Sequence, residues 1–98
     1  MAIETTEATS VESIIRKFVA EELLFTDRLP IGDGDSFIEN SIVDSTGILE
    51  LEIFVERAFG IEVRDEDVVP ENFDSVSKLA SYIRRKQKAA RVAGTQMA

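Results

Sequence analysis

The segment 43–47, Val-Asp-Ser-Thr-Gly, holds the side chain whose chemistry stands out in this sequence, the hydroxyl of Ser45. Asp44 is a favoured N-cap residue, so a helix is predicted to begin here with Ser45 in its first turn. A hydroxyl in that place is a candidate for covalent modification by another protein. A serine after an aspartate cap is also ordinary helix punctuation, so the residues alone leave both interpretations open.

Two apolar side chains, Leu49 and Ile53, continue a row that starts at Ser45. At about 100° per residue, they lie on the same side of the predicted helix as the serine. We call Leu49 and Ile53 the docking row. Glu52 and Glu56 lie beside it. Apolar side chains among carboxylates predict a contact surface for a partner that brings a hydrophobic spot and Lys or Arg.

The same helix is predicted to end at Phe59, before the C-terminal signal of Gly60, and to carry a separate core face. The members of that face share the spacing of a buried helical stripe: Ile48, Leu51, Phe54, Val55, Ala58 and Phe59. The docking row therefore lies outside the predicted core. An alternative to docking is that the preceding loop covers the row with Ile38 or Ile42.

The composition narrows the possible classes of function. A chain of 98 residues supports one small core, and 44% hydrophobic residues predict that it folds. It contains no cysteine and no histidine, which removes disulfides, thiolate metal sites and the commonest general base. Since mainly carboxylates, lysines and Tyr82 remain, we expect no enzymatic activity of its own.

The charge is acidic and unevenly distributed. The chain has a net charge of −8, and residues 1–83 hold six bases and all nineteen acids, a net charge of −13. Such a body repels nucleic acid and anionic membranes, and favours a monomer and basic protein partners. No apolar run has the length of a membrane span and the N-terminus does not resemble a signal peptide, so we expect a cytoplasmic protein.

A first helix is predicted over residues 10–25, with Thr9 as its N-cap and Glu12 completing a capping box. Its apolar side chains recur at helical spacing: Val11, Ile14, Ile15, Phe18, Val19 and Leu23. The connection 26–43 is long for so small a domain. It is predicted to be held by its own apolar residues: Ile31, Phe37, Ile38 and Ile42.

Acids in this connection invite comparison with a calcium-binding loop: Asp33, Asp35 and Glu39. With the loop started at Asp33, the position that requires glycine falls on Ile38. A start at Asp27 puts apolar side chains at two ligand positions. Neither register fits, so a solvated acidic loop and no metal site are predicted.

The second half of the chain is predicted to hold two more helices. A brief one begins with the acids at 65–67, continues into Val68 and Val69, and stops at Pro70. The last one starts at a cap formed by Asp74 or Ser75. The last helix buries one stripe: Val76, Leu79, Ala80 and Ile83.

These elements predict one all-α domain over residues 9–90, with flexible ends at 1–8 and 91–98. Its architecture is a four-helix bundle with three longer helices, a short third helix, and a long loop between helices one and two. Basic residues at the end of the last helix complement the negative end of its dipole.

The segment 43–63, VDSTGILELEIFVERAFGIEV, is followed by DED at 65–67 and PENFDSV at 70–76. The order is an Asp-Ser pair at a helix start, Glu five and Leu six residues after the serine, a Phe closing the helix, a short acidic helix and an apolar last helix. This ordered set resembles the acyl carrier protein family over about residues 10–88. A lone Asp-Ser pair would be weak evidence, whereas the ordered set is specific.

The resemblance implies that Ser45 is the attachment point of 4′-phosphopantetheine and that Asp44 helps the modifying enzyme to recognise it. A phosphopantetheinyl transferase would bring coenzyme A and Mg²⁺, and the Ser45 hydroxyl would attack the β-phosphate. The new phosphodiester would lie at the positive end of the helix dipole. The thiol of the arm would hold acyl or aminoacyl groups as thioesters for partner enzymes.

The implied partners also include an adenylating ligase that loads acyl or aminoacyl groups, and acyltransferases or synthases. Docking would use an apolar pair and the nearby acids: Leu49, Glu50, Glu52, Ile53, Glu56, Asp65, Glu66 and Asp67. Exposed contacts of this kind give weak, fast and salt-sensitive binding, which suits a shuttle. The alternative function is an unmodified acidic helical adaptor that binds a basic protein partner.

Two features depart from the usual pattern of the family. Thr46 and Gly47 follow the serine, where many members have an apolar residue directly after it. Gly47 predicts close approach of the arm or of a partner backbone, unless the helix start merely tolerates it. The basic end of the last helix predicts a specialised stand-alone carrier rather than the housekeeping fatty-acid one. Six phenylalanines in a small core favour short or polar acyl or aminoacyl cargo.

Overall fold

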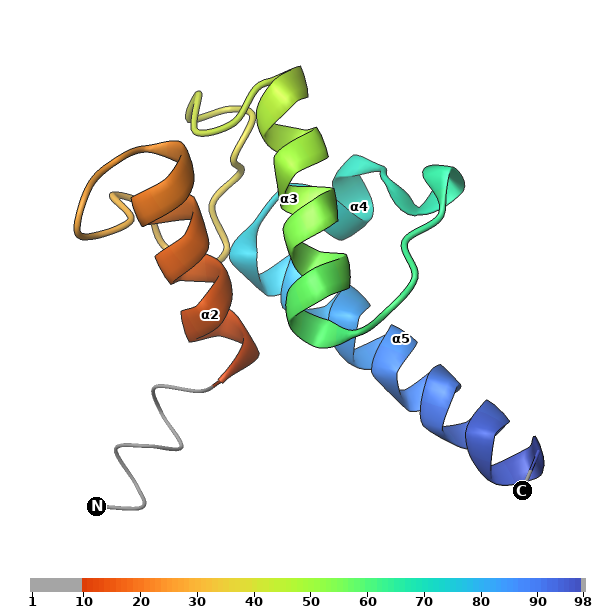
Figure 1. The fold of residues 1–98 in the computed structure, drawn as a ribbon. Coiled ribbons are helices and arrows are strands. Elements are labelled where there is room, and N and C mark those ends of the chain that lie inside the picture. The colour runs from red at the N-terminus through yellow and green to blue at the C-terminus, as the bar shows by residue number, and fades with distance from the viewer. Residues whose placement is uncertain (1–9, 98) are drawn as a thin grey trace, which may run out of the picture.

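The computed structural model describes residues 10–97, and every regular element in that range is a helix (Figure 1). In chain order they are α2 (Val11–Phe18), the π-helical turn η1 (Val19–Leu23), α3 (Ser45–Phe59), the 3₁₀ turn η2 (Asp65–Asp67), α4 (Pro70–Phe73) and α5 (Val76–Met97). The predicted all-α class, with three longer helices and a long first loop, is confirmed. The predicted flexible segment 1–8 lies outside the described residues.

The first helix begins one residue later than the sequence predicts. Ser10, not Thr9, is the N-cap, because the Ser10 hydroxyl accepts a hydrogen bond of 3.1 Å from the backbone N–H of Ser13. The prediction of Thr9 as cap and Glu12 as its capping-box partner is therefore wrong. The Glu12 carboxylate instead accepts two bonds of 2.7 Å from Arg84, which tie α2 to α5.

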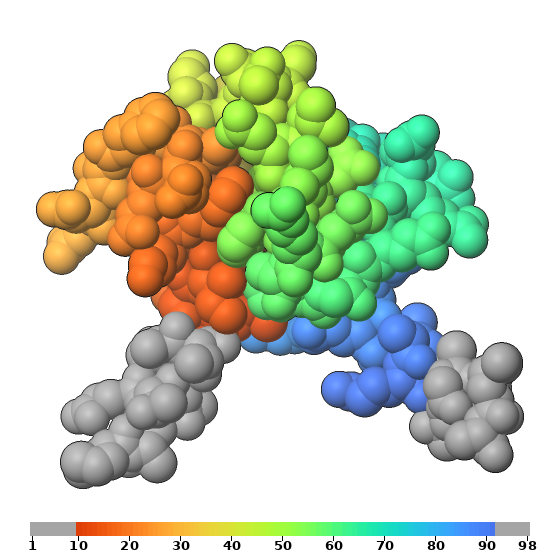
Figure 2. Space-filling model, viewed as in Figure 1, coloured from red at the N-terminus to blue at the C-terminus, as the bar shows by residue number. Residues whose placement is uncertain are grey.

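The core lies where α2, α3, α4 and α5 meet. Its fully buried side chains come from every longer helix and include Ile15, Val19, Leu51, Val55, Phe73, Val76, Leu79, Ala80 and Ile83. Figure 2 shows α2 and α3 side by side on one face, and Phe18 and Phe54 stack between them with ring centroids 4.0 Å apart. The predicted stripe of α5 is confirmed, whereas Ala58, predicted to face the core, is exposed.

The long loop between η1 and α3 is anchored at Phe37, whose ring is fully buried. The N–H of Phe37 donates to the backbone oxygen of Asp74 at 2.8 Å, and the Asp74 carboxylate accepts from the Ser36 hydroxyl at 2.6 Å. Ile31 and Ile42 also pack against the core. Ile38 was predicted to help hold the loop, but its side chain is 55% exposed.

Near the last helix, one prediction needs correction and another is confirmed. Pro70 begins α4 instead of ending a helix, because proline has no N–H and the first helical turn needs none. Of the two predicted caps of α5, Ser75 fills the role, since its hydroxyl accepts a bond of 3.0 Å from the N–H of Lys78.

The backbone of α5 is helical as far as Met97, past the point where the sequence predicts a loose tail. The flexibility of residues 91–98 stays a prediction. Within residues 10–97, no helix combines the length and the apolar character needed to cross a membrane.

Candidate functional site

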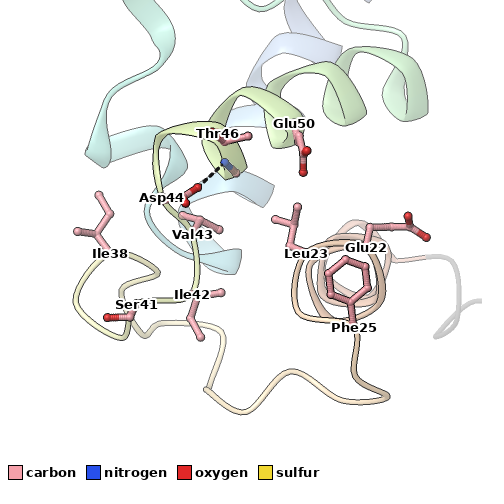
Figure 3. Close-up of a pocket in the computed structure, with 11 residues that line it drawn as sticks. Glu22, Leu23, Phe25, Ile38, Ser41, Ile42, Val43, Asp44, Thr46 and Glu50 are labelled. Atoms are coloured by element: carbon pink, nitrogen blue, oxygen red, sulfur yellow. Dashed lines mark hydrogen bonds between the residues drawn. The ribbon is translucent and has the colours of Figure 1, made fainter.

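Ser45 is the first residue of α3 and is exposed. Asp44 is the N-cap, as predicted: its Oδ1 accepts a hydrogen bond of 2.8 Å from the backbone N–H of Gly47, drawn as a dashed line in Figure 3. The helix then runs to Phe59, and Gly60 ends it with a φ of 65°, a conformation that favours glycine. The predicted bounds of this helix are confirmed.

Gly47 has a reason to be glycine that lies within the chain itself. The residue is buried, and a Cβ built on it would lie 3.1 Å from the Cβ of Val43. Val43 packs against the edge of the core, so it has limited freedom to move away. The close approach predicted at Gly47 is therefore made by Val43, and no partner backbone is needed to explain it.

The docking row lies outside the core, as the helical spacing predicts. Leu49 is 55% exposed and Ile53 is 47% exposed, and among the described residues they belong to the few large apolar side chains that face solvent. The alternative that Ile38 or Ile42 covers the row is wrong, because Leu49 and Ile53 remain open to solvent.

Of the glutamates near the row, Glu50 is exposed, Glu52 is half-buried and Glu56 has a partner within the fold. Glu56 Oε2 accepts a bond of 2.9 Å from the N–H of Val63, which fixes the link that follows α3. Partial burial raises the pKa of Glu52, and the nearby charges of Asp65 and Glu56 raise it further. Glu52 thus carries a repulsion that a cationic partner would relieve.

The three acids of η2 also divide into exposed side chains and one that is bound within the fold. Asp65 and Glu66 are exposed. Asp67 accepts bonds from the Tyr82 hydroxyl at 2.7 Å and from Lys86 Nζ at 3.4 Å. The Tyr82 hydrogen bond is the main cause that lowers the pKa of Asp67, while burial and the same bond raise the pKa of Tyr82. Asp67 therefore joins η2 to α5.

Replacing Tyr82 with phenylalanine is expected to lower the free energy of unfolding by about 1–2 kcal/mol at pH 7. A carboxyl whose pKa is lowered in the folded state stabilises the fold above its unfolded pKa, near about 3.9, and loses that contribution as the pH falls through the folded value. The difference between the two proteins should therefore stay constant between pH 7 and about pH 5 and shrink as the pH falls below about 4. Urea unfolding across that range measures it, and a constant difference would contradict a role for the Asp67 charge.

A hollow of about 500 Å³ adjoins Ser45 (Figure 3). Residues on both sides of Ser45 line it, together with the end of η1 and the loop before α3: Glu22, Leu23, Phe25, Ile38, Ser41, Ile42, Val43, Asp44, Thr46, Gly47 and Glu50. No local pattern in the sequence indicates a role for Glu22 or Phe25. Both come next to the site only in the folded chain, where the end of η1 meets the start of α3.

Two acids of the long loop are hydrogen-bonded within the chain. Asp33 accepts a bond of 2.6 Å from Arg16, and Asp35 accepts one of 2.8 Å from the N–H of Gly32. Among the described residues, no group of three or more acids is placed to hold a metal ion.

Comparison with known proteins supplies the family. A scan against models of protein families finds no match. The chain is 32% identical over 77 residues to an acyl carrier protein of Desulforapulum autotrophicum, which covers 79% of this chain and 97% of that protein. It is 34% identical over 79 residues to an acyl carrier protein of Buchnera aphidicola, which covers 81% of this chain and 96% of that protein. With this coverage and an all-helical fold, the chain belongs to the acyl carrier protein family and has a carrier role.

Proposed function

We propose that Ser45 carries 4′-phosphopantetheine, attached by a phosphopantetheinyl transferase with coenzyme A and Mg²⁺. The observation that carries this proposal is the exposed hydroxyl at the first position of α3, next to the Asp44 cap, in a chain of this family. The Ser45 Oγ–phosphorus bond forms and the pyrophosphate bond of coenzyme A breaks. The adenosine bisphosphate leaves and the hydroxyl proton goes to a base of the transferase.

The surroundings of Ser45 fit a phosphodiester. The side chain lies at the N-terminus of a helix of 15 residues, where the dipole favours negative charge. The Asp44 carboxylate is turned to the N–H of Gly47. Ser45 is exposed, so a transferase can reach its oxygen without opening the fold. When bound, the group supplies a thiol that this chain lacks, and cargo is held there as a thioester.

Partner enzymes are proposed to dock on the docking row and the acids around it. Support comes from the exposure of Leu49 and Ile53, and from the charges of Glu50 and Glu52 beside them. Asp65 and Glu66 extend this surface along η2; their side chains are open to solvent. Glu56 and Asp67 already bind within the fold, so we assign them a contribution through charge rather than through direct contact. Since these contacts are exposed and charged, binding should weaken with salt.

The cargo is proposed to be short or polar, loaded by an acyl- or aminoacyl-adenylating ligase and used by acyltransferases or synthases in the cytoplasm. The apolar hollow between α3 and α4 has only about 110 Å³, lined by Ile48, Val68 and Phe73 among others. Phe37 and Phe73 fill part of the core and leave less room for cargo. Phe25 lies outside the core, so not all six phenylalanines of the sequence limit that room. That the chain is a specialised rather than a housekeeping carrier stays a prediction.

Mass spectrometry tests the attachment. After incubation with coenzyme A, Mg²⁺ and a broad-specificity transferase, the intact protein should gain the mass of one phosphopantetheine group. Fragmentation of the peptide that contains residues 44–57 should locate the group on Ser45. An unmodified protein, or a group on another residue, would contradict the proposal, and the former result would favour the acidic adaptor.

A further inference from the structure

Phe25 has an unusual backbone and an unusual exposure for an aromatic residue. Its φ is 57°, in the left-handed region, and its side chain is 85% exposed. The residue follows the π-helical turn η1, and the next N–H, that of Thr26, closes the helix end by donating to the oxygen of Ala20 at 2.8 Å. Helix ends commonly use this conformation, but the residue that adopts it without strain is glycine.

Neither the backbone nor the core of the fold accounts for a phenylalanine at this position. A left-handed conformation is unfavourable for a bulky side chain, and exposure of an aromatic ring to water removes the gain from burial. Within residues 10–97, Phe25 does not belong to the core or to the side chains packed against it. A strained and exposed residue of this kind calls for a role outside folding.

The place of Phe25 indicates what that role is. Its ring stands at one side of the hollow beside Ser45, across from the loop that carries Ile38 and Val43, with Thr46 and Glu50 at a third side (Figure 3). The lining of the hollow includes three carboxylates, those of Glu22, Asp44 and Glu50, and no basic side chain. An aromatic face next to carboxylates is suited to a cation with an apolar stem, which is the chemistry of an arginine or lysine side chain.

We propose that Phe25 is a docking residue for the enzyme that modifies Ser45, and that a basic side chain of that enzyme lies on the Phe25 ring between Glu22 and Glu50. This inference rests on the proposed function. An enzyme that forms a bond to the oxygen of Ser45 must cover the surface directly around it. Enzymes that act later are proposed to dock on Leu49, Ile53 and the acids around them, and they react with the far end of the arm. The transferase alone reacts at the Ser45 oxygen, so it is the partner that the hollow fits best.

Opposite effects of Phe25→Gly on stability and on binding test the proposal. Glycine relieves the left-handed strain, so the thermal midpoint should stay equal to that of the wild type or rise by a few degrees. The KM for the carrier in the transferase reaction should rise about tenfold with kcat little changed, since a contact shared by the bound state and the transition state is lost. Phe25→Tyr keeps the ring and should keep the KM of the wild type.

Unchanged KM for Phe25→Gly would overturn the proposal. A thermal midpoint well below that of the wild type would also overturn it, because the ring would then serve the fold. If the wild-type protein is not modified at all, the proposed function fails and not merely this contact, so the two failures are distinguishable.

The charges of the hollow give a second test. Glu22→Gln and Glu50→Gln should each raise the KM of the carrier several-fold and reduce its dependence on salt. Glu62→Gln is the matched control, since Glu62 is exposed but lies beyond the opposite end of α3. Equal effects of all three substitutions would show a response to net charge alone and would contradict a basic side chain placed on Phe25.

Discussion

Replacing Ser45 with alanine is expected to abolish the addition of phosphopantetheine and to leave the fold intact. The hydroxyl oxygen of Ser45 is the atom that forms the new bond, and alanine offers no nucleophile there. The helix keeps its cap, because Asp44 and not Ser45 accepts the hydrogen bond from Gly47. Ser45 is exposed and alanine favours helices, so the free energy of unfolding should change by less than about 0.5 kcal/mol.

Two neighbouring hydroxyls provide matched controls. Thr46 follows Ser45 in α3 and Ser41 lies in the loop before it, and both are exposed and line the same hollow. Thr46→Ala and Ser41→Ala should gain one group by intact mass, as the wild type does, whereas Ser45→Ala should gain none. Circular dichroism checks that all the variants are folded. Modification of Ser45→Ala to the extent of the wild type would remove Ser45 from the site.

The helix that carries the site could be predicted because its signals are local. Asp44 and Gly60 act on the backbone within a few residues of themselves, so the cap and the left-handed end follow from the sequence. The exposure of Leu49 and Ile53 follows from spacing along the same helix. The order of these motifs along the chain is enough to indicate the family.

The remaining features depend on segments that meet only in the fold. Glu56 and Asp67 look like free surface acids in the sequence, yet the N–H of Val63 and the hydroxyl of Tyr82 bind them. Asp74 looks like a helix cap, but its carboxylate binds the loop at Ser36 instead. No local pattern reports such partners, because they come from residues up to 38 positions away in the chain.

At Phe25 the prediction from the sequence is wrong for a different reason. The apolar spacing extends the first helix to this residue, whereas the structure ends the helix earlier through a π-helical turn. The left-handed backbone of Phe25 runs against its own preference, and local rules assign such a position to glycine. A phenylalanine where the backbone favours glycine, at a surface next to the candidate site, indicates a functional role for its side chain.

Replacing Phe37 with alanine is expected to lower the free energy of unfolding by about 3–5 kcal/mol. Phe37 is among the largest of the fully buried side chains, and alanine would leave a cavity in its place. The backbone of Phe37 also joins the long loop to the start of α5, through Asp74, and accepts a bond of 2.8 Å from the N–H of Ile42. Since small domains have only about 5–15 kcal/mol in total, the variant should unfold at markedly lower urea concentrations.

Ile38→Ala is the control. Ile38 is next to Phe37 in the chain but 55% exposed, so its replacement should lower the free energy of unfolding by less than about 1 kcal/mol. Phe37 and Ile42 hold the stretch of loop that ends at Val43 and Asp44, so loosening them should also disturb the approach to Ser45. Among folded molecules, Phe37→Ala should then be modified more slowly by the transferase than the wild type. If urea unfolding gave Phe37→Ala the stability of Ile38→Ala, the loop would be held by other contacts, and the cap at Asp44 would not depend on this anchor.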